Sequence, residues 1–230
     1  MSLITLACSN YNSEKWIERY LKSVNDQFLP EFSLIIVDAN STDNSLNIIK
    51  QYRFRKGISC KIVSCPNRIT FYEALNVVTG ICDSEYIVSY NTDDHFYPST
   101  LTVIKEYIVR YPSTDIFYSS FGITKDSAHL ERIHQIHMPP EHDINVLLHA
   151  CYIGPFSIVK KKTLLEIGNY NTSFKICGDY ELWMRFARAK KTFTRIPEVL
   201  GNYFENPIGI STNTNSLNLR LAEESLIRNS

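Results

Sequence analysis

The chain lacks several features that assign a sequence quickly to a common class. It has eight glycines in 230 residues, and neither a GxGxxG nor a P-loop pattern follows an apolar run. Basic and acidic residues number 24 each, so no excess charge points to a nucleic-acid partner. No apolar run approaches the length of a membrane span, and the N-terminus lacks the basic segment of a signal peptide. We therefore expect a soluble, cytoplasmic protein, with peripheral membrane contact left open.

A disulfide framework and a zinc site are also not expected. The six cysteines form no CxxC pair, and four lie in or beside apolar runs, where a reduced thiol packs as a small hydrophobe. His134 and His137 form a His-x-x-His pair that invites a metal hypothesis. The following Met138, Pro139 and Pro140 indicate a loop, which offers no helix to align two ligands, so we expect no metal there.

Strand-like and helix-like segments alternate over the first 120 residues. Apolar runs at 3–8, 33–38, 61–64, 85–90 and 115–119 predict strands, and amphipathic stretches at 13–26, 46–52, 72–81 and 99–109 predict helices. This alternation is typical of βαβ units, so we expect an α/β fold with a mainly parallel sheet. Residues 121–145 are polar and His-rich and predict a loop or lid. Further helices are expected from 178 and over 217–227, where leucines are available for packing or for a homo-oligomer.

Polar side chains follow three of the predicted strands. Ser9 and Tyr11 follow the first, Asp38 follows the second, and Asp93 and Asp94 follow the fourth. Ligands of such sheets bind at the carboxyl ends of the strands. A ring can stack on a nucleobase, a single acid can accept from base or ribose, and an acid pair can hold Mg²⁺ or Mn²⁺ beside a diphosphate. Taken alone, the acid pair fits a plain turn before a helix equally well.

Two acids open the helix expected from residue 178. Asp179 lies in its first turn, where the helix dipole favours a negative charge, and Glu181 can pair with Arg185 at i,i+4. These residues alone leave a structural role and a catalytic role open for Asp179.

Taken in chain order, the motifs resemble family-2 glycosyltransferases. The matching segments are Ser9-Asn-Tyr-Asn12, Ile35-Ile-Val-Asp38, Asn40-Ser-Thr-Asp-Asn-Ser45, Thr92-Asp93-Asp94 and Gly178-Asp-Tyr-Glu-Leu-Trp-Met-Arg185. Phe71-Tyr-Glu-Ala-Leu-Asn76 and Ile208-Gly-Ile-Ser211 are similar to elements of a bacterial polysaccharide-assembly branch. No single motif is specific, but their joint order over residues 3–211 is.

The resemblance implies a single GT-A domain. A Rossmann-like nucleotide-sugar-binding half is expected over about 1–120, an acceptor and catalytic-base half over about 121–215, and a C-terminal helix over 216–230. It also implies an inverting, metal-dependent transfer from a nucleotide sugar, most simply a UDP-sugar. The acceptor is then a hydroxyl of a glycan, a glycolipid or a protein-linked acceptor.

The resemblance also assigns residue roles. Asp179 is the implied general base. Asp94 is the implied direct ligand of Mn²⁺ or Mg²⁺, and Asp93 contacts the ribose or helps to orient the ion. The implied nucleotide-sugar contacts are Ser9, Tyr11, Asp38, Asn40, Arg68, Asn76, Thr92 and Asp93.

Three positions depart from the family's pattern. Gly178 stands where a glutamate often precedes the base, and Ala39 stands where a second aspartate often follows Asp38. Residues 203–206 contain neither the arginine nor the histidine that often lies beside the diphosphate. Phosphate support then falls to a lysine, to Arg68, or to the backbone around Gly209 and Ser211.

Two other functions fit parts of the pattern. A nucleotidyltransferase also uses metal-binding acids on an α/β sheet, but residues 9–14 lack its Gly-rich basic loop. A non-catalytic module that binds a sugar nucleotide or glycan needs no base, and the retained acids argue against it.

Overall fold

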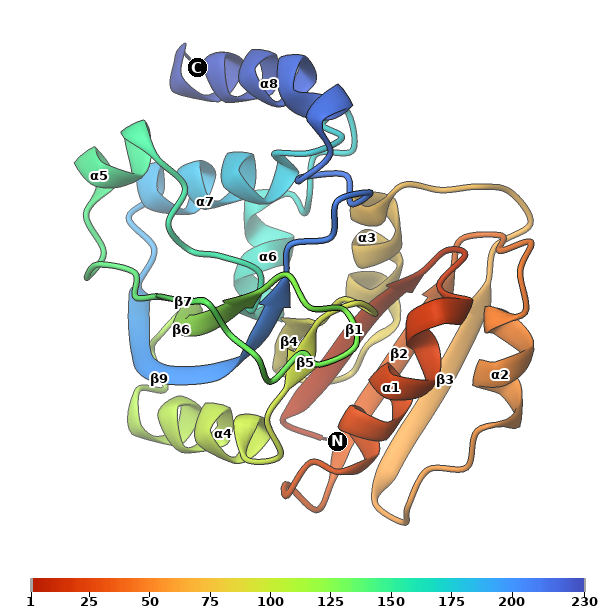
Figure 1. The fold of residues 1–230 in the computed structure, drawn as a ribbon. Helices are drawn as coiled ribbons and strands as arrows, with labels where there is room; N and C mark the ends of the chain where they lie inside the picture. The colour runs from red at the N-terminus through yellow and green to blue at the C-terminus, as the bar shows by residue number, and fades with distance from the viewer. Residues whose placement is uncertain (1, 230) are drawn as a thin grey trace.

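The computed structural model describes residues 2–229, which form one mixed sheet of nine strands with helices on both faces (Figure 1). The strands are β1 (Ile4–Asn10), β2 (Phe32–Asp38), β3 (Ile58–Ser64), β4 (Tyr86–Ser89), β5 (His95–Phe96), β6 (Ile116–Thr124), β7 (Gln135–His137), β8 (Ile158–Lys160) and β9 (Phe193–Phe204). The helices are α1 (Glu14–Asn25), α2 (Ser45–Gln51), α3 (Phe71–Ile81), α4 (Thr100–Arg110), α5 (Ile144–His149), α6 (Lys161–Ile167), α7 (Gly178–Arg188) and α8 (Leu217–Asn229), with a 3₁₀ turn η1 (Thr214–Ser216).

The N-terminal strands are parallel, as the alternating pattern predicts. They lie in the order β3-β2-β1-β4, with Cys8 opposite Ile36 and Asp38 opposite Ser64. β1 and β2 are covered on both faces, which explains their nearly continuous apolar sequence. The carboxyl ends of these four strands therefore meet at one edge of the sheet.

The C-terminal strands make the sheet mixed. β8 lies antiparallel between β4 and β6, and β9 pairs parallel with β6 over a long stretch that includes register shifts after Ser119. The predicted loop over 121–145 is partly wrong, because β6 continues to Thr124 and β7 pairs with it. β7 escapes prediction because Gln135 and Ile136 are exposed at the sheet's margin, so it shows no apolar alternation.

Each face of the sheet has its own core. α1, α2 and α4 bury residues such as Leu21, Ile49 and Ile104 against one face. α3, α5, α6, α7 and α8 bury Val78, Trp183 and other side chains against the opposite face. Figure 1 shows α1 and α2 lying over β1–β3 and α8 beyond α7 at the far end of the molecule. Within residues 2–229, no helix combines the length and the apolar character that crossing a bilayer requires.

Candidate active site

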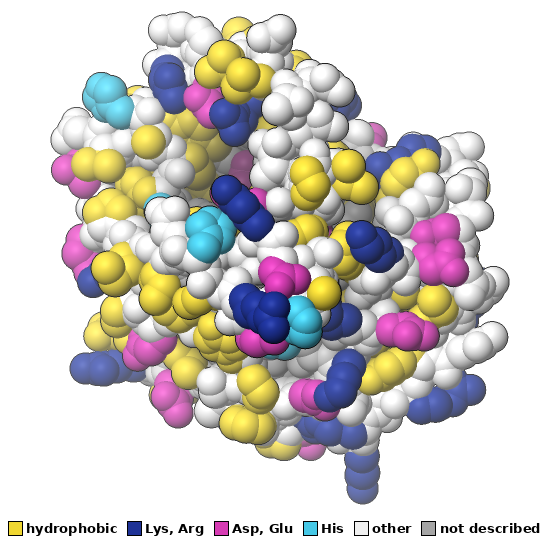
Figure 2. Space-filling view, in the orientation of Figure 1, with side chains coloured by type: hydrophobic (Ala, Val, Ile, Leu, Met, Phe, Trp, Pro, Cys, Tyr) yellow, Lys and Arg dark blue, Asp and Glu magenta, His cyan; other side chains and the backbone are white. Residues whose placement is uncertain are grey.

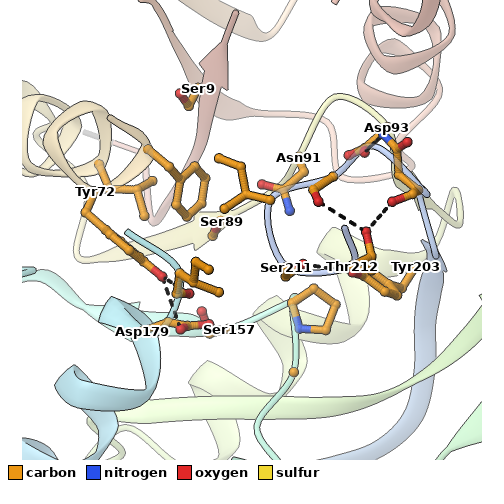
Figure 3. A pocket seen from close by; sticks show the side chains of 18 of the residues that line it. Ser9, Tyr72, Ser89, Asn91, Asp93, Ser157, Asp179, Tyr203, Ser211 and Thr212 are labelled. Atoms are coloured by element: carbon orange, nitrogen blue, oxygen red, sulfur yellow. Dashed lines mark hydrogen bonds between the residues drawn. The ribbon is translucent and has the colours of Figure 1, made fainter. Parts of the chain in front are cut away.

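The edge where β1 and β4 end opens into a cavity of about 450 Å³ (Figure 3). Small-molecule sites typically occupy about 300–1,000 Å³. Four of the predicted site residues line this cavity, namely Ser9, Thr92, Asp93 and Asp179. The start of α3, the 151–157 segment, the loop before α7 and the loop after β9 complete its walls.

Asp93 forms one wall, together with side chains that follow β4 and β9. Its Oδ2 accepts a hydrogen bond from Asn206 Nδ2 at 2.9 Å. Arg19 on α1 approaches from behind and donates from Nη2 to the Asp93 carbonyl oxygen at 3.3 Å. Figure 3 shows Asp93 and Asn91 on the side of the cavity opposite Asp179. The Asp93 carboxylate is thus held in place and faces the cavity.

Asp94 lies behind this wall. Its side chain is 1% exposed and accepts from the Phe204 N–H at 3.0 Å and from Asn91 Nδ2 at 3.3 Å. Burial, and secondarily the charge of Asp93, raises the pKa of Asp94 well above its usual value. The prediction that Asp94 meets the ion directly requires an exposed carboxylate, whereas here Asp93 is the acid that lines the cavity. The two adjacent side chains point in different directions, and the sequence does not reveal which of them faces the cavity.

The acid pair suits a divalent cation that takes some of its ligands from the protein and the rest from a bound substrate. Among residues 2–229 there is no cluster of three or more His, Cys, Asp and Glu side chains that could hold an ion alone. Mg²⁺ is usually bound through one or two carboxylates, with phosphate oxygens and waters completing the shell. A cation beside Asp93 also offsets the repulsion between two adjacent carboxylates, one of them buried.

Asp179 forms the opposite wall. Its Oδ1 accepts from the Tyr180 N–H at 2.8 Å, and the Tyr72 hydroxyl lies 3.3 Å from the same oxygen. Burial raises the pKa of Asp179, although these hydrogen bonds act in the opposite direction. A raised pKa brings an aspartate nearer to the working range of a general base. The carboxylate therefore has an orientation and an environment suited to accepting a proton.

Tyr72 explains the departure at Gly178. A Cβ placed on Gly178 would come within 2.6 Å of the Tyr72 ring, so the ring occupies the space that a larger residue there would need. The Tyr72 hydroxyl also donates to the Ile176 carbonyl oxygen at 2.6 Å, and its ring stacks on Tyr170 with 5.8 Å between centroids. The space beside Gly178 is therefore filled by a tyrosine of α3, a helix that is distant in sequence but adjacent in space.

The remaining nucleotide-contact predictions fall outside this cavity. Tyr11 is 41% exposed, and the Arg68 guanidinium lies 3.4 Å from its ring centroid, covering one face. Asp38 is buried and accepts from Asn10 Nδ2 at 2.6 Å and from the Ser41 hydroxyl at 2.6 Å. Asn40, in the next turn, has a positive φ of 64°, a conformation that asparagine tolerates.

Asn76 is held by backbone contacts. Its Oδ1 accepts from the Tyr170 N–H at 3.0 Å, and its Nδ2 donates to the Tyr170 carbonyl oxygen at 2.9 Å. Both polar groups are thus engaged with backbone, and Asn76 does not line the cavity. These bonds join α3 to the loop before α7, and the contact of Asn76 with the nucleotide sugar stays a prediction.

Several lining residues were not predicted as ligand contacts. Asn206, Tyr72 and Lys175 all face the cavity. The loop that contains Gly209 and Ser211 also faces it, and its backbone is among the phosphate supports that the sequence offers. Asn206 and Tyr72 lie within segments that the family resemblance singles out, so their position offered a signal. Lys175 offered none beyond its proximity to Asp179.

The surface around the site carries no large field of one sign. Figure 2 shows Lys and Arg side chains interspersed with Asp and Glu over this face, in keeping with a net charge of zero. Within the cavity, Lys175 is a cationic lining residue and can attract an anionic group.

Curated relatives share parts of this sequence. The chain is 26% identical over 213 residues to the dTDP-rhamnosyl transferase RfbG of Shigella flexneri, covering 86% of this chain and 72% of RfbG. It is 29% identical over 103 residues to the poly(ribitol-phosphate) β-N-acetylglucosaminyltransferase TarS of Staphylococcus aureus, covering 44% of this chain. That match spans 18% of the length of TarS.

Solved structures confirm the predicted α/β, GT-A fold. A crystal structure of S. aureus TarS with UDP superposes with a TM-score of 0.74 at 20% identity, covering 90% of this chain and 61% of that chain. The mannosyltransferase PcManGT of Pyrobaculum calidifontis, solved with GDP-Man and Mn²⁺, gives 0.72 at 16% identity, covering 99% and 63%. The family model described as "Glycosyl transferase family 2" matches residues 6–178, and the chain therefore belongs to glycosyl transferase family 2.

Proposed function

We propose that this chain is a metal-dependent, inverting glycosyltransferase that moves a sugar from a UDP-sugar to the hydroxyl of a glycan, glycolipid or protein-linked acceptor. The observation that carries the proposal is the placement of Asp93 and Asp179 on opposite walls of one cavity. One wall can bind the diphosphate end of a donor while the other activates an acceptor. Family membership favours this function over a nucleotidyltransferase.

Asp179 acts as the general base. An acceptor hydroxyl enters between the walls, Asp179 takes its proton, and the oxygen attacks the anomeric carbon of the donor. The bond from that carbon to the diphosphate oxygen breaks, and the leaving group takes the electron pair. Since the attack is direct and opposite to the leaving group, the configuration at the carbon inverts. Proton removal by a positioned base typically contributes about 10²–10⁴-fold to the rate.

Asp93 is the proposed metal ligand, with Asp94 supporting it from behind. Bound there, Mn²⁺ or Mg²⁺ supplies charge stabilisation for the departing diphosphate. Asn206 and Arg19 hold the Asp93 side chain and backbone in place. This assignment makes Asp93, which the resemblance places at the ribose or beside the ion, the direct ligand in place of Asp94.

The nucleoside end is proposed to lie beyond Ser9, where Tyr11, Asp38, Asn40 and Arg68 gather at the ends of β1 and β2. A base that stacks on the covered face of Tyr11 must displace Arg68, which can then contact the base or a phosphate. UDP is favoured because the structurally similar TarS was solved with UDP. RfbG is named for a dTDP-linked sugar and PcManGT was solved with GDP-Man, so dTDP- and GDP-sugars are the alternative donors to test.

Release of nucleoside diphosphate from a panel of UDP-, dTDP- and GDP-sugars tests the proposal. With Mn²⁺ and an acceptor glycan, we expect UDP release from a UDP-sugar, its loss with EDTA, and its recovery when Mn²⁺ is restored. Transfer that persists in EDTA contradicts the metal requirement. Turnover of a dTDP- or GDP-sugar in preference to every UDP-sugar contradicts the donor assignment.

A further inference from the structure

A carboxylate of the C-terminal helix lies directly behind the loop that leads to the candidate base. Glu223 on α8 is 5% exposed and accepts hydrogen bonds from three consecutive backbone N–H groups. Lys175 donates to Oε1 at 2.7 Å, and Ile176 and Cys177 donate to Oε2 at 3.0 Å and 2.8 Å. These residues immediately precede Gly178, where α7 begins.

This contact differs from the other acidic contacts of α8. Glu224, the next residue, pairs with Arg220 and Arg228 on the surface of the same helix. Glu223 appears in none of the ion pairs found among residues 2–229 and is instead satisfied by backbone donors. Burying a carboxylate is costly unless such donors surround it, and packing of α8 could be achieved with an apolar side chain. The choice of an acid at this position thus calls for a reason beyond packing.

We propose that Glu223 is a positioning residue that aims Asp179 into the cavity. By holding the N–H groups of residues 175–177, its carboxylate fixes where the first turn of α7 starts. Asp179 is the second residue of that turn, so the direction of its side chain follows from the loop's position. The inference rests on the proposed function, because it assigns Glu223 to the base of sugar transfer.

Glu223 also acts on Asp179 through its charge. The titratable groups that face Asp179 from neighbouring elements are Tyr72 of α3, Cys151, Tyr170, Lys175, Cys177 and Glu223 of α8. Burial is the largest cause that raises the pKa of Asp179, and the negative charge of Glu223 raises it further. Removing that charge therefore lowers the pKa of Asp179 and moves the acid limb of the activity profile to lower pH.

The test compares Glu223→Gln with Glu224→Gln, which makes the same change of charge one residue away. In Glu223→Gln we expect kcat to fall about 10- to 100-fold, as misplacement of a catalytic group does, with the donor KM unchanged. Its acid limb should move to lower pH. Glu224→Gln should retain the wild-type kcat and pH profile. Glu223→Asp keeps the charge but shortens the reach, so its kcat should fall while its acid limb stays in place.

Amide hydrogen exchange supplies a readout that does not depend on activity. The amides of residues 175–177 should exchange faster in Glu223→Gln and Glu223→Asp than in Glu224→Gln. Equal exchange in all three variants overturns the proposal, as does faster exchange with wild-type kcat and an unmoved acid limb. If Glu223→Gln does not fold, the same comparison is made with Glu223→Asp.

Measuring Asp179→Asn in parallel separates the two proposals. If that variant lacks turnover while Glu223→Gln behaves like Glu224→Gln, then only the positioning role fails. If Asp179→Asn retains wild-type turnover, the base assignment fails, and the role of Glu223 is overturned with it.

Discussion

The acids on the two walls of the cavity are held in different ways. Asp93 lies in the loop after β4 and is fixed by Asn206, in the loop after β9, and by a backbone contact of Arg19 on α1. Asp179 opens a helix whose first turn depends on Tyr72 of α3 and on Glu223 of α8. The Asp93 side of the cavity, called the donor wall after its proposed role, is thus built mainly from loops that follow strands of the sheet. The Asp179 side, called the base wall after its proposed role, is built from helices, so substitutions in α3 or α8 should affect Asp179.

Asp179→Asn should have the largest effect. The amide keeps the shape of the side chain but cannot take a proton, so kcat should fall about 10²–10⁴-fold. Single-turnover transfer with a saturating donor measures the chemical step directly. Sugar transfer by this variant at the wild-type rate would contradict the assignment of Asp179 as the general base.

Substitutions of Asp93 and Asp94 test which of the two acids of the donor wall holds the metal. Asp93 lines the cavity and Asp94 is buried behind it. We therefore expect Asp93→Asn to weaken UDP binding in Mn²⁺ by at least about 10- to 100-fold, the range that loss of an outer-shell partner of a metal ligand costs. Asp94→Asn serves as the matched control and should retain more of the Mn²⁺-dependent affinity. The reverse order would restore Asp94 as the direct ligand.

The pH dependence should report the base wall. Burial raises the pKa of Asp179, so the fraction of active carboxylate increases with pH through that raised value, above the ordinary value of about 3.9. A profile of kcat against pH should show an acid limb above that ordinary value, and a profile that stays flat down to the ordinary value would contradict the raised pKa. The same shift makes the folded state bind this proton more tightly. The contribution of Asp179 to stability therefore declines as pH rises from the unfolded to the folded pKa.

Gly178→Ala is expected to destabilise the folded protein. Its new Cβ meets the Tyr72 ring, so we expect a loss of about 1–3 kcal/mol in the free energy of unfolding, as in other overpacked cores. Gly80→Ala on α3 is the control, because nothing lies within 4 Å of a Cβ there. Since alanine suits a helix interior better than glycine, the control should gain about 0.5–1 kcal/mol. Urea unfolding measures the free energy of unfolding of both variants. Equal values would show that the Tyr72 ring moves aside without a cost in stability.

The sequence predicts the residues of the donor wall better than the contacts of the base wall, because the donor wall follows strands that the sequence predicts. Strands β1, β2 and β4 show apolar runs, and the residues that follow each run meet at one edge because the strands are parallel. Sequence spacing does not tell which of two adjacent acids faces the cavity, and that depends on the local backbone after β4. The pairing of Asn76 with the Tyr170 backbone is also hidden from the sequence, because a motif reports which residues occur, not which backbone they pair with.

The contacts of the base wall lie beyond what a local pattern can encode. Glu223 sits in a helix whose leucines suggest only packing, and nothing in its neighbourhood marks it as the partner of residues 175–177. The coupling of Gly178 to Tyr72 likewise joins two motifs that are far apart in the chain. Both relations appear only when α3 and α8 are placed against the start of α7.

Calorimetric titration of UDP with Mn²⁺ into the wild type, Asp93→Asn and Asp179→Asn, paired with a turnover assay of each, tests the division between the two walls most directly. The account predicts that Asp179→Asn binds UDP as the wild type does but fails to transfer sugar, whereas Asp93→Asn loses the Mn²⁺-dependent part of the affinity. Wild-type binding by Asp93→Asn, or transfer by Asp179→Asn, would contradict it.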